Sequence, residues 1–199
     1  MHVSFDFCNT LFTSNPAFKF HRLQMFKDRT GTSEDLIEHT FAAVGDWHNN
    51  QLMLKDGLAL TSQSLCSLAF RILRVSPEDY ASLIADMEEL FLKYPPLPTC
   101  NSTVMEWRSC AGSASILSNT TFISGAVIRS FLDSEQEEFD FMIFSDELGY
   151  GKPQAKAFQA ILFELRSRVG LADDQQIFHV GDDPKFDSSP TGDIKSILL

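Results

Sequence analysis

The sequence predicts an α/β fold: a Rossmann-like parallel five-stranded sheet with helices on both faces, plus a small all-helical cap. Three observations predict it. Short apolar runs recur along the chain, segments with helical spacing separate them, and roughly a hundred residues lie between the first two runs. Alternating strands and helices are typical of a parallel sheet covered on both faces, and 199 residues suffice for one such domain with a modest insert.

Five apolar runs have the length and composition of strands. They span residues 2–7, 115–118, 140–144, 176–180 and 194–199. A helical stripe precedes the fourth run, where Phe158, Ile161, Leu162 and Leu165 fall on one face. The spacing therefore predicts strands that are joined by helical crossovers.

The long gap after the first run predicts an inserted helical bundle. Ser33 and Ser76 are candidate N-caps, and Pro77 stands where a helix tolerates proline best. Apolar residues repeat at helical spacing after each cap, until the prolines of residues 94–98 end the pattern. We therefore expect residues 14–95 to form the cap and residues 1–13 and 96–199 to form the α/β core.

Composition and charge exclude several classes of protein. Sixteen Lys and Arg against 27 Asp and Glu give a net charge of -11, which would repel nucleic acid and an anionic membrane surface. The longest uncharged stretch, 109–128, is rich in Ser, Thr and Asn, unlike a membrane helix. No secretion signal opens the chain, and its four cysteines form no CxxC pair, so we expect reduced thiols and a cytoplasmic protein. Oligomeric state stays open.

Polar residues follow the apolar runs and predict a site. In open α/β sheets a ligand binds at the carboxyl ends of the strands, so these residues should converge. A lysine, Lys152, adds one positive charge before a predicted helix. The set is Asp6, Cys8, Asn9 and Thr10 after the first run, Ser118 and Asn119 after the second, and Asp182, Asp183 and Asp187 after the fourth.

Four motifs in this order resemble the haloacid dehalogenase-like (HAD) superfamily of aspartate-nucleophile hydrolases over nearly the whole chain. They are Phe5-Asp6-Phe7-Cys8-Asn9-Thr10-Leu11-Phe12, Ile116-Leu117-Ser118-Asn119, the segment from Phe144 through Gly151-Lys152-Pro153 to Phe158, and His179-Val180-Gly181-Asp182-Asp183-Pro184-Lys185-Phe186-Asp187. Each motif alone is weak evidence. The four together are strong evidence, because they occur in this order and each follows a predicted strand. The helical insert resembles the C1-type cap of this superfamily, which covers the site and selects the substrate.

The resemblance implies roles for these residues. Asp6 would attack phosphorus and form an aspartyl-phosphate that water hydrolyses. Asp6, the backbone carbonyl of Cys8 and Asp182 would bind Mg²⁺, a hard cation that prefers oxygen ligands.

The same resemblance implies how the substrate phosphate is held. Ser118, the Asn119 amide and Lys152 would bind its oxygens, and Cys8, Asn9 and Thr10 of the first motif would also contact the substrate phosphate. Asp183 and Asp187 would orient a water ligand of the metal or Lys152. The partner is then a small phosphorylated metabolite.

Two positions depart from the pattern of the superfamily. Its phosphatases carry a second Asp two residues after the nucleophile, as proton donor and later base, and here that residue is Cys8. Such catalysis contributes about 10² to 10⁴ in rate, so we expect slow phosphatase activity that favours good leaving groups. The next residue is Asn9 in place of the usual Gly, a mild change because Asn tolerates positive φ.

Each candidate also has a structural interpretation. Asp6, Ser118 and Asn119 could cap helices, the three late aspartates could form an acidic turn, and Cys8 could be an inert small hydrophobe. As a hypothesis for the missing proton donor, Asp46 or His48 in a loop predicted at residues 45–50 could reach the site from the cap.

Three functions are compatible with the sequence. The leading one is a Mg²⁺-dependent phosphatase. The second is a metal-independent 2-haloacid dehalogenase, which also lacks the second acid but would leave the aspartates of the fourth motif unexplained. The third is a catalytically weak or inactive HAD-fold protein that binds a ligand or another protein.

Overall fold

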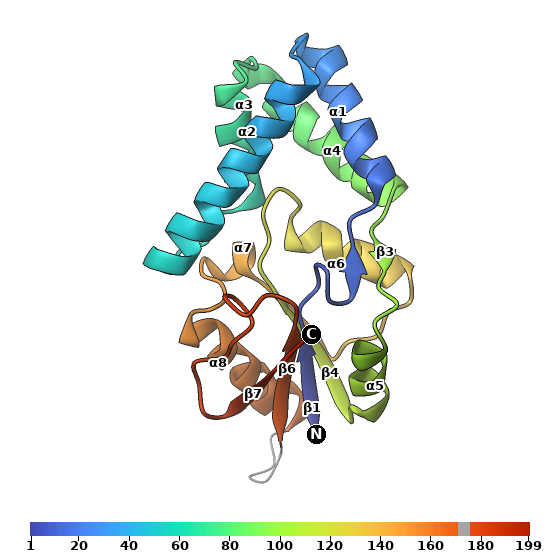
Figure 1. Cartoon of the computed structure of the whole chain (residues 1–199), viewed down its shortest axis with the longest axis vertical. Helices are drawn as coiled ribbons and strands as arrows, with labels where there is room; N and C mark the ends of the chain where they lie inside the picture. Colours follow the sequence, from blue (N-terminus) through green and yellow to red (C-terminus); the bar gives the residue numbers. More distant parts are fainter. Residues whose placement is uncertain (171–175) are drawn as a thin grey trace.

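The computed structural model of the chain, which describes residues 1–170 and 176–199, contains the predicted parallel sheet (Figure 1). Its strands run in the order β5-β4-β1-β6-β7, and all four pairings are parallel. The strands are β1 (His2–Phe5), β4 (Ser113–Ser118), β5 (Phe141–Phe144), β6 (Ile177–Gly181) and β7 (Ile194–Leu198). The predicted α/β class is confirmed, with strand ends that shift by one or two residues.

Helices cover both faces of the sheet. On one face, Val3, Phe5 and Ile116 pack against α5 (Ser102–Cys110) and α6 (Gly125–Ser134). On the opposite face, Leu117 and Ile177 pack against α8 (Ala155–Glu164) and its extension η3 (Leu165–Val169). The predicted stripe on Phe158, Ile161, Leu162 and Leu165 is buried there. Alternation along each strand thus supplies both layers of the core.

The inserted segment forms a helical cap with its own apolar core. Its elements are α1 (Pro16–Thr30), α2 (Glu34–Trp47), the π-helix η1 (His48–Asp56), α3 (Ser62–Ile72), the short 3₁₀ turn η2 (Pro77–Asp79) and α4 (Tyr80–Lys93). The predicted cap residue Ser33 accepts a hydrogen bond from the Leu36 N–H at 3.4 Å. Phe26, Phe70 and Met87 are fully buried in the cap core.

The cap is tied to the core by a short strand pairing and by hydrogen bonds. β2 (Phe12–Thr13) pairs antiparallel with β3 (Leu97–Pro98), so the two connecting chains run side by side. Farther out, Ala59 N–H donates to the Gly149 carbonyl at 3.0 Å, and the Gln154 amide donates to the Met53 carbonyl at 3.3 Å. In Figure 1, α2 and η1 form one helical run that descends toward the core. The cap therefore lies over the carboxyl ends of the strands.

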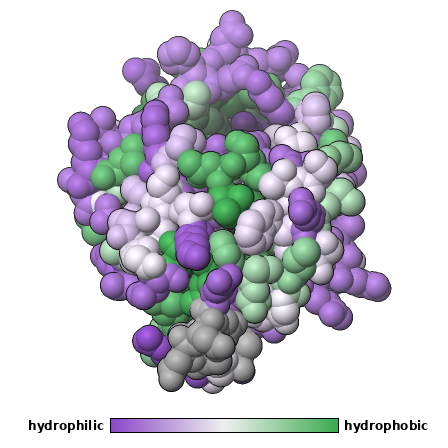
Figure 2. Space-filling view, turned by 60° about the horizontal axis from the view of Figure 1, so that its bottom comes forward, coloured by the Kyte–Doolittle hydropathy of each residue, from purple (hydrophilic) through white to green (hydrophobic). Residues whose placement is uncertain are grey.

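The described residues form no helix that could span a membrane. None of the helices in those ranges is long and apolar enough to cross a bilayer. Figure 2 shows hydrophobic residues in the middle of one face and hydrophilic residues around much of its rim.

A buried histidine in the sheet gives the fold a predictable acid sensitivity. His2 is fully buried, its ring nitrogens lie 2.7 Å from Ser113 Oγ and 2.9 Å from Ser115 Oγ, and burial lowers its pKa to about 4. The unfolded chain binds a proton near pH 6.5, whereas the folded chain does not until about pH 4. The stability that neutral His2 contributes is therefore present above pH 6.5 and is lost as the pH falls toward 4.

We expect the free energy of unfolding to fall between pH 7 and pH 4.5, with up to about 3 kcal/mol of the fall due to His2. His2→Gln should show a smaller fall in urea titrations at the two pH values. Other buried histidines titrate equally in both proteins, so an identical fall in the variant would contradict this assignment.

Candidate active site

The site lies where β1, β4 and β6 end beneath the cap. A cavity of about 260 Å³ opens there. Its lining is largely polar and comes from the core except for one cap residue, Asn49. The lining residues are Asp6, Cys8, Asn9, Asn49, Asn119, Thr121, Lys152, Asp182, Asp183, Phe186 and Asp187. The predicted convergence of residues from three strand ends and the Lys152 segment is thus observed.

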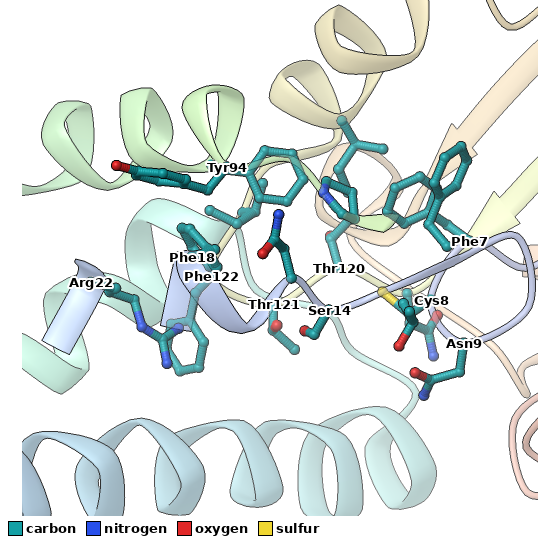
Figure 3. A pocket seen from close by; sticks show the side chains of 18 residues that line it. Phe7, Cys8, Asn9, Ser14, Phe18, Arg22, Tyr94, Thr120, Thr121 and Phe122 are labelled. Carbon is teal, nitrogen blue, oxygen red and sulfur yellow. The ribbon is translucent and has the colours of Figure 1, made fainter. Parts of the chain in front are cut away.

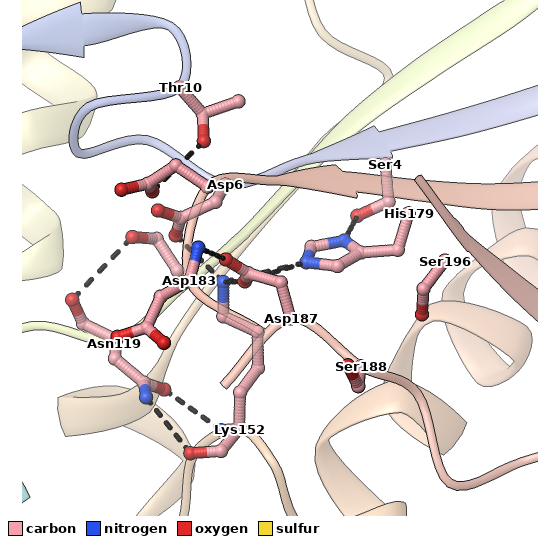
Figure 4. Close-up of polar contacts among 12 residues, drawn as sticks. Ser4, Asp6, Thr10, Asn119, Lys152, His179, Asp183, Asp187, Ser188 and Ser196 are labelled. Atoms are coloured by element: carbon pink, nitrogen blue, oxygen red, sulfur yellow. Dashed lines mark hydrogen bonds and ion pairs between the residues drawn. The ribbon is translucent and has the colours of Figure 1, made fainter. Parts of the chain in front are cut away.

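Lys152 is at the centre of the site. Its side chain is almost fully buried, and its Nζ donates to Asp6 Oδ1 at 2.8 Å and to Asp187 Oδ1 (Figure 4). His179 lies behind this pair, with Nε2 at 3.2 Å from Asp187 Oδ1 and Nδ1 at 3.2 Å from Ser4 Oγ. A neutral ring protonated at Nε2 donates to Asp187 and accepts from the Ser4 hydroxyl. The ammonium is therefore held by two carboxylates, and His179 fixes one of them, Asp187, in turn.

The surroundings shift the pKa values of these groups. Burial raises the pKa of Asp6, although Lys152 opposes that change. Burial alone would lower the pKa of Lys152, but Asp6 and Asp187 override it and raise the pKa. The pKa of Asp187 is lowered in spite of its burial, because His179 and Lys152 donate to it. The pKa of His179 is lowered by burial and by Lys152, so the ring stays neutral.

Three carboxylates are close enough to hold a metal ion. Asp6, Asp182 and Asp187 each offer an oxygen, and these oxygens lie within 4.8 Å of one another. Both Asp187 oxygens already accept hydrogen bonds, one from Lys152 and the other from the Asp183 N–H at 2.9 Å. Asp6 and Asp182 are therefore the better placed ligands, and an all-oxygen set suits Mg²⁺.

A glycine makes this arrangement possible. A Cβ on Gly181 would lie 2.1 Å from Asp187 Cγ, so any other residue would displace the carboxylate. The fourth motif thus needs glycine for close approach rather than for its backbone conformation.

Asn119 and Thr10 hold other site residues in place. The Asn119 side chain accepts from the Lys152 N–H at 2.8 Å and donates to the Lys152 carbonyl at 2.9 Å, which fixes the backbone of the lysine. Thr10 was expected to contact phosphate, but it is buried and its hydroxyl faces Asp182 Oδ1 at 3.3 Å. It is absent from the described cavity lining, so the structure places it behind a metal ligand. Ser118 is buried, does not line the described cavity, and its hydroxyl donates to the Asn119 carbonyl at 3.5 Å.

The two departures in the first motif have clear consequences. Asn9 has φ of 58°, the left-handed region that asparagine tolerates. Cys8 is solvent-exposed, yet the protein atoms around its sulfur raise the pKa to about 12, and the charges of Asp6 and Asp182 act in the same direction. A thiol with this pKa neither gives nor takes a proton readily near neutral pH.

The hypothesis for Asp46 and His48 is wrong on position. The expected loop at 45–50 is helical, because α2 continues into η1. Gly45 fits within the helix, where a Cβ would lie 3.5 Å from Phe122. Asp46 is exposed, whereas His48 is buried and its Nε2 accepts from the Leu60 N–H at 3.1 Å. Burial lowers the pKa of His48, and neither residue lines the described cavity.

Sequence reasoning missed several residues of the site: Thr121 and Phe186, which line the cavity, and also Asn49 and His179. Asn49 is the cap residue that reaches the cavity, and its position one helical turn after Gly45 could have indicated this had the segment been interpreted as helix. His179 opens the fourth motif but was not a candidate site residue; it is buried and contacts Asp187. Its position three residues before Asp182 placed it in the strand, but nothing in the spacing indicated which face it occupies.

Comparisons with known proteins place the fold. No protein-family model matches the sequence, and no curated protein matches it by sequence. Solved structures do match. A 2-haloacid dehalogenase from Pseudomonas syringae pv. tomato has a TM-score of 0.56 and 20% identity over 92% of this chain and 78% of that chain.

Two further matches carry other names. A magnesium-bound protein classed as a HAD-hydrolase, YfnB from Bacillus subtilis, has a TM-score of 0.60 and 13% identity over 93% of this chain and 79% of its own. A protein classed as a β-phosphoglucomutase from Thermotoga maritima has a TM-score of 0.58 and 17% identity, over 100% and 85%. At these identities the matches define the fold, which is the one that the motifs predicted.

The raised pKa of Asp6 predicts an effect on stability. Folding disfavours its charged form, so ionised Asp6 destabilises the metal-free protein at neutral pH. We expect Asp6→Asn to unfold at a higher temperature than the wild type at pH 7 in EDTA. The advantage should shrink as the pH falls toward 3.8, the usual pKa, because Asp6 is then protonated in the folded chain. An equal or lower unfolding temperature at pH 7 would contradict this.

Proposed function

Because the chain has the haloacid dehalogenase-like (HAD) fold, we propose that it is a Mg²⁺-dependent phosphatase of a small phosphorylated metabolite, acting through an aspartyl-phosphate on Asp6. The activity is slow, because Cys8 stands where a phosphatase of this superfamily would carry its second aspartate.

The charge balance of the site carries this proposal. Asp6, Asp182 and Asp187 bring three negative charges within 4.8 Å, and Lys152 brings one positive charge. With all four groups ionised, two negative charges are left without compensation. A divalent cation balances them, whereas a chemistry without metal leaves the repulsion in place.

The residues of the chain divide the remaining work. Asp6 is the first residue after β1, and its carboxylate lines the cavity. There it can attack an incoming phosphorus atom in line. Lys152 holds that carboxylate and offers positive charge to the phosphoryl oxygens. Asn119, His179 and Asp187 position Lys152. Mg²⁺, when bound by Asp6 and Asp182, would supply charge neutralisation for the phosphoryl group.

One observation favours a second function, a metal-independent 2-haloacid dehalogenase. Such an enzyme needs Asp6 as nucleophile but no acid at position 8, and a thiol with a pKa of about 12 supplies none. The carboxylate cluster is the feature that this alternative leaves unexplained.

An assay of phosphate release separates the functions. We expect the protein to hydrolyse acetyl phosphate in the presence of Mg²⁺, with the rate lost in EDTA and in Asp6→Asn. An acyl phosphate is chosen because its leaving group needs little protonation. Halide release from chloroacetate without metal would favour the dehalogenase. Equal inactivity of wild type and Asp6→Asn on both substrates would leave the ligand-binding or protein-binding role.

A substitution at position 8 tests the origin of the slow rate. Cys8→Asp should raise the turnover of a phosphate ester with a poor leaving group by about 10² to 10⁴, because a carboxylic acid can protonate the leaving oxygen. The rate with acetyl phosphate should change far less. Cys8→Ser is the matched control, since it changes the side chain without adding an acid. A folded Cys8→Asp variant with no gain on the ester would contradict this explanation.

A further inference from the structure

A second cavity, of about 280 Å³, adjoins the active-site cavity. Both cavities are lined by Cys8, Asn9, Asn119 and Thr121, so a molecule whose reacting group meets Asp6 can extend from one into the other. The second cavity lies between cap and core and is mainly apolar and aromatic. Phe7 and Phe12 line it from the core, and Phe18, Phe91 and Tyr94 line it from the cap side.

One charged side chain, Arg22 of α1, lines this apolar cavity among the described residues. Figure 3 shows Arg22 at one end, Cys8 and Asn9 at the other, and aromatic rings between them. Its guanidinium carbon lies 5.5 Å from the Phe18 ring centroid and 4.8 Å from that of Phe41. These rings stabilise the cation through their faces, but they carry no oxygen or nitrogen atom that could accept a hydrogen bond from the guanidinium.

Arg22 has no anionic partner within the described part of the chain. None of the ion pairs found there includes it, and its Nε is buried without a hydrogen-bond acceptor. Glu38 on the neighbouring helix is paired with Lys19 instead. Burial lowers the pKa of Arg22, yet a guanidinium stays charged in proteins. Arg22 itself is half-buried, but a guanidinium whose Nε is buried without a partner is unfavourable, and an anion from a ligand would relieve it.

We propose that the second cavity binds the organic part of the substrate, a flat apolar body, and that Arg22 pairs with a carboxylate that this body carries. The aromatic walls suit a ring, and the volume accommodates a group about the size of a benzoate. A carboxylate matches the single charge and the forked donors of one guanidinium, whereas a phosphate dianion would leave a charge uncompensated. This inference rests on the proposed function for the reacting group, but the binding itself does not.

The test measures binding without turnover. The probes are 4-hydroxybenzoate and its neutral analogue 4-hydroxybenzamide, titrated by calorimetry into the full-length wild type, Arg22→Met and Arg22→Lys. We expect the wild type to bind the benzoate about 10- to 100-fold more tightly, as for a charged hydrogen-bonded pair. Arg22→Met keeps the apolar stem and should lose this preference, while Arg22→Lys should retain part of it.

Two outcomes would overturn the proposal. One is a wild type that binds both probes equally or neither, and the other is a folded Arg22→Met that still prefers the benzoate; either would leave Arg22 with only its contacts to Phe18 and Phe41. If Arg22→Met fails to fold, the comparison of the two probes on the wild type decides.

Turnover is then compared separately. With Mg²⁺ present, 4-carboxyphenyl phosphate should show a KM about tenfold or more below that of phenyl phosphate, and this gap should close in Arg22→Met. A benzoate preference without any phosphate release would refute the proposed phosphatase and keep the anion site. Phosphate release without a benzoate preference would do the reverse.

Discussion

The buried ammonium of Lys152 is the interaction on which the site depends. A charge with 1% exposure is tolerated only with partners, and Asp6 and Asp187 supply them from β1 and from the turn after β6. Because the same contacts fix the Asp6 carboxylate, one ion-pair network joins three chain segments and orients the carboxylate that we propose as the nucleophile. Asn119 completes it by holding the lysine backbone from β4.

The part of the site that the sequence predicted is the part set by strand ends. Asp6, Asn119 and Asp182 each follow an apolar run, and a parallel sheet brings such positions to one edge. What a side chain does after it arrives depends on neighbours from other segments. Thr10 was expected to contact phosphate, but its hydroxyl faces Asp182, and no spacing along the chain encodes that choice. His179 illustrates the same limit, because its contact with Asp187 depends on the turn at Gly181.

One segment of the cap, residues 45–50, was predicted as a loop but is helical in the structure. Gly45, Asp46 and the two asparagines after His48 are typical of a loop, yet α2 continues through them into η1, with Gly45 close to Phe122. The consequence is functional. A loop would have offered Asp46 or His48 to the site, whereas the helix offers Asn49 and turns His48 inward to Leu60.

The two cavities divide recognition between the core and the cap. The core provides three carboxylates and one lysine, an excess of negative charge that suits a dication and a reacting anionic group. Cap and core together provide the aromatic walls of the second cavity, and the cap adds one arginine without a partner among the described residues, which suits an apolar body with a negative end. Since β2 and β3 connect the cap to the core beside Phe12, the first motif reaches both cavities, and Cys8 and Asn9 lie at the boundary between them. A side chain at position 8 therefore borders both cavities. Under the proposed function it faces both the reacting group and the leaving group, so a thiol there in place of an acid would slow departure of the product more than attack by Asp6.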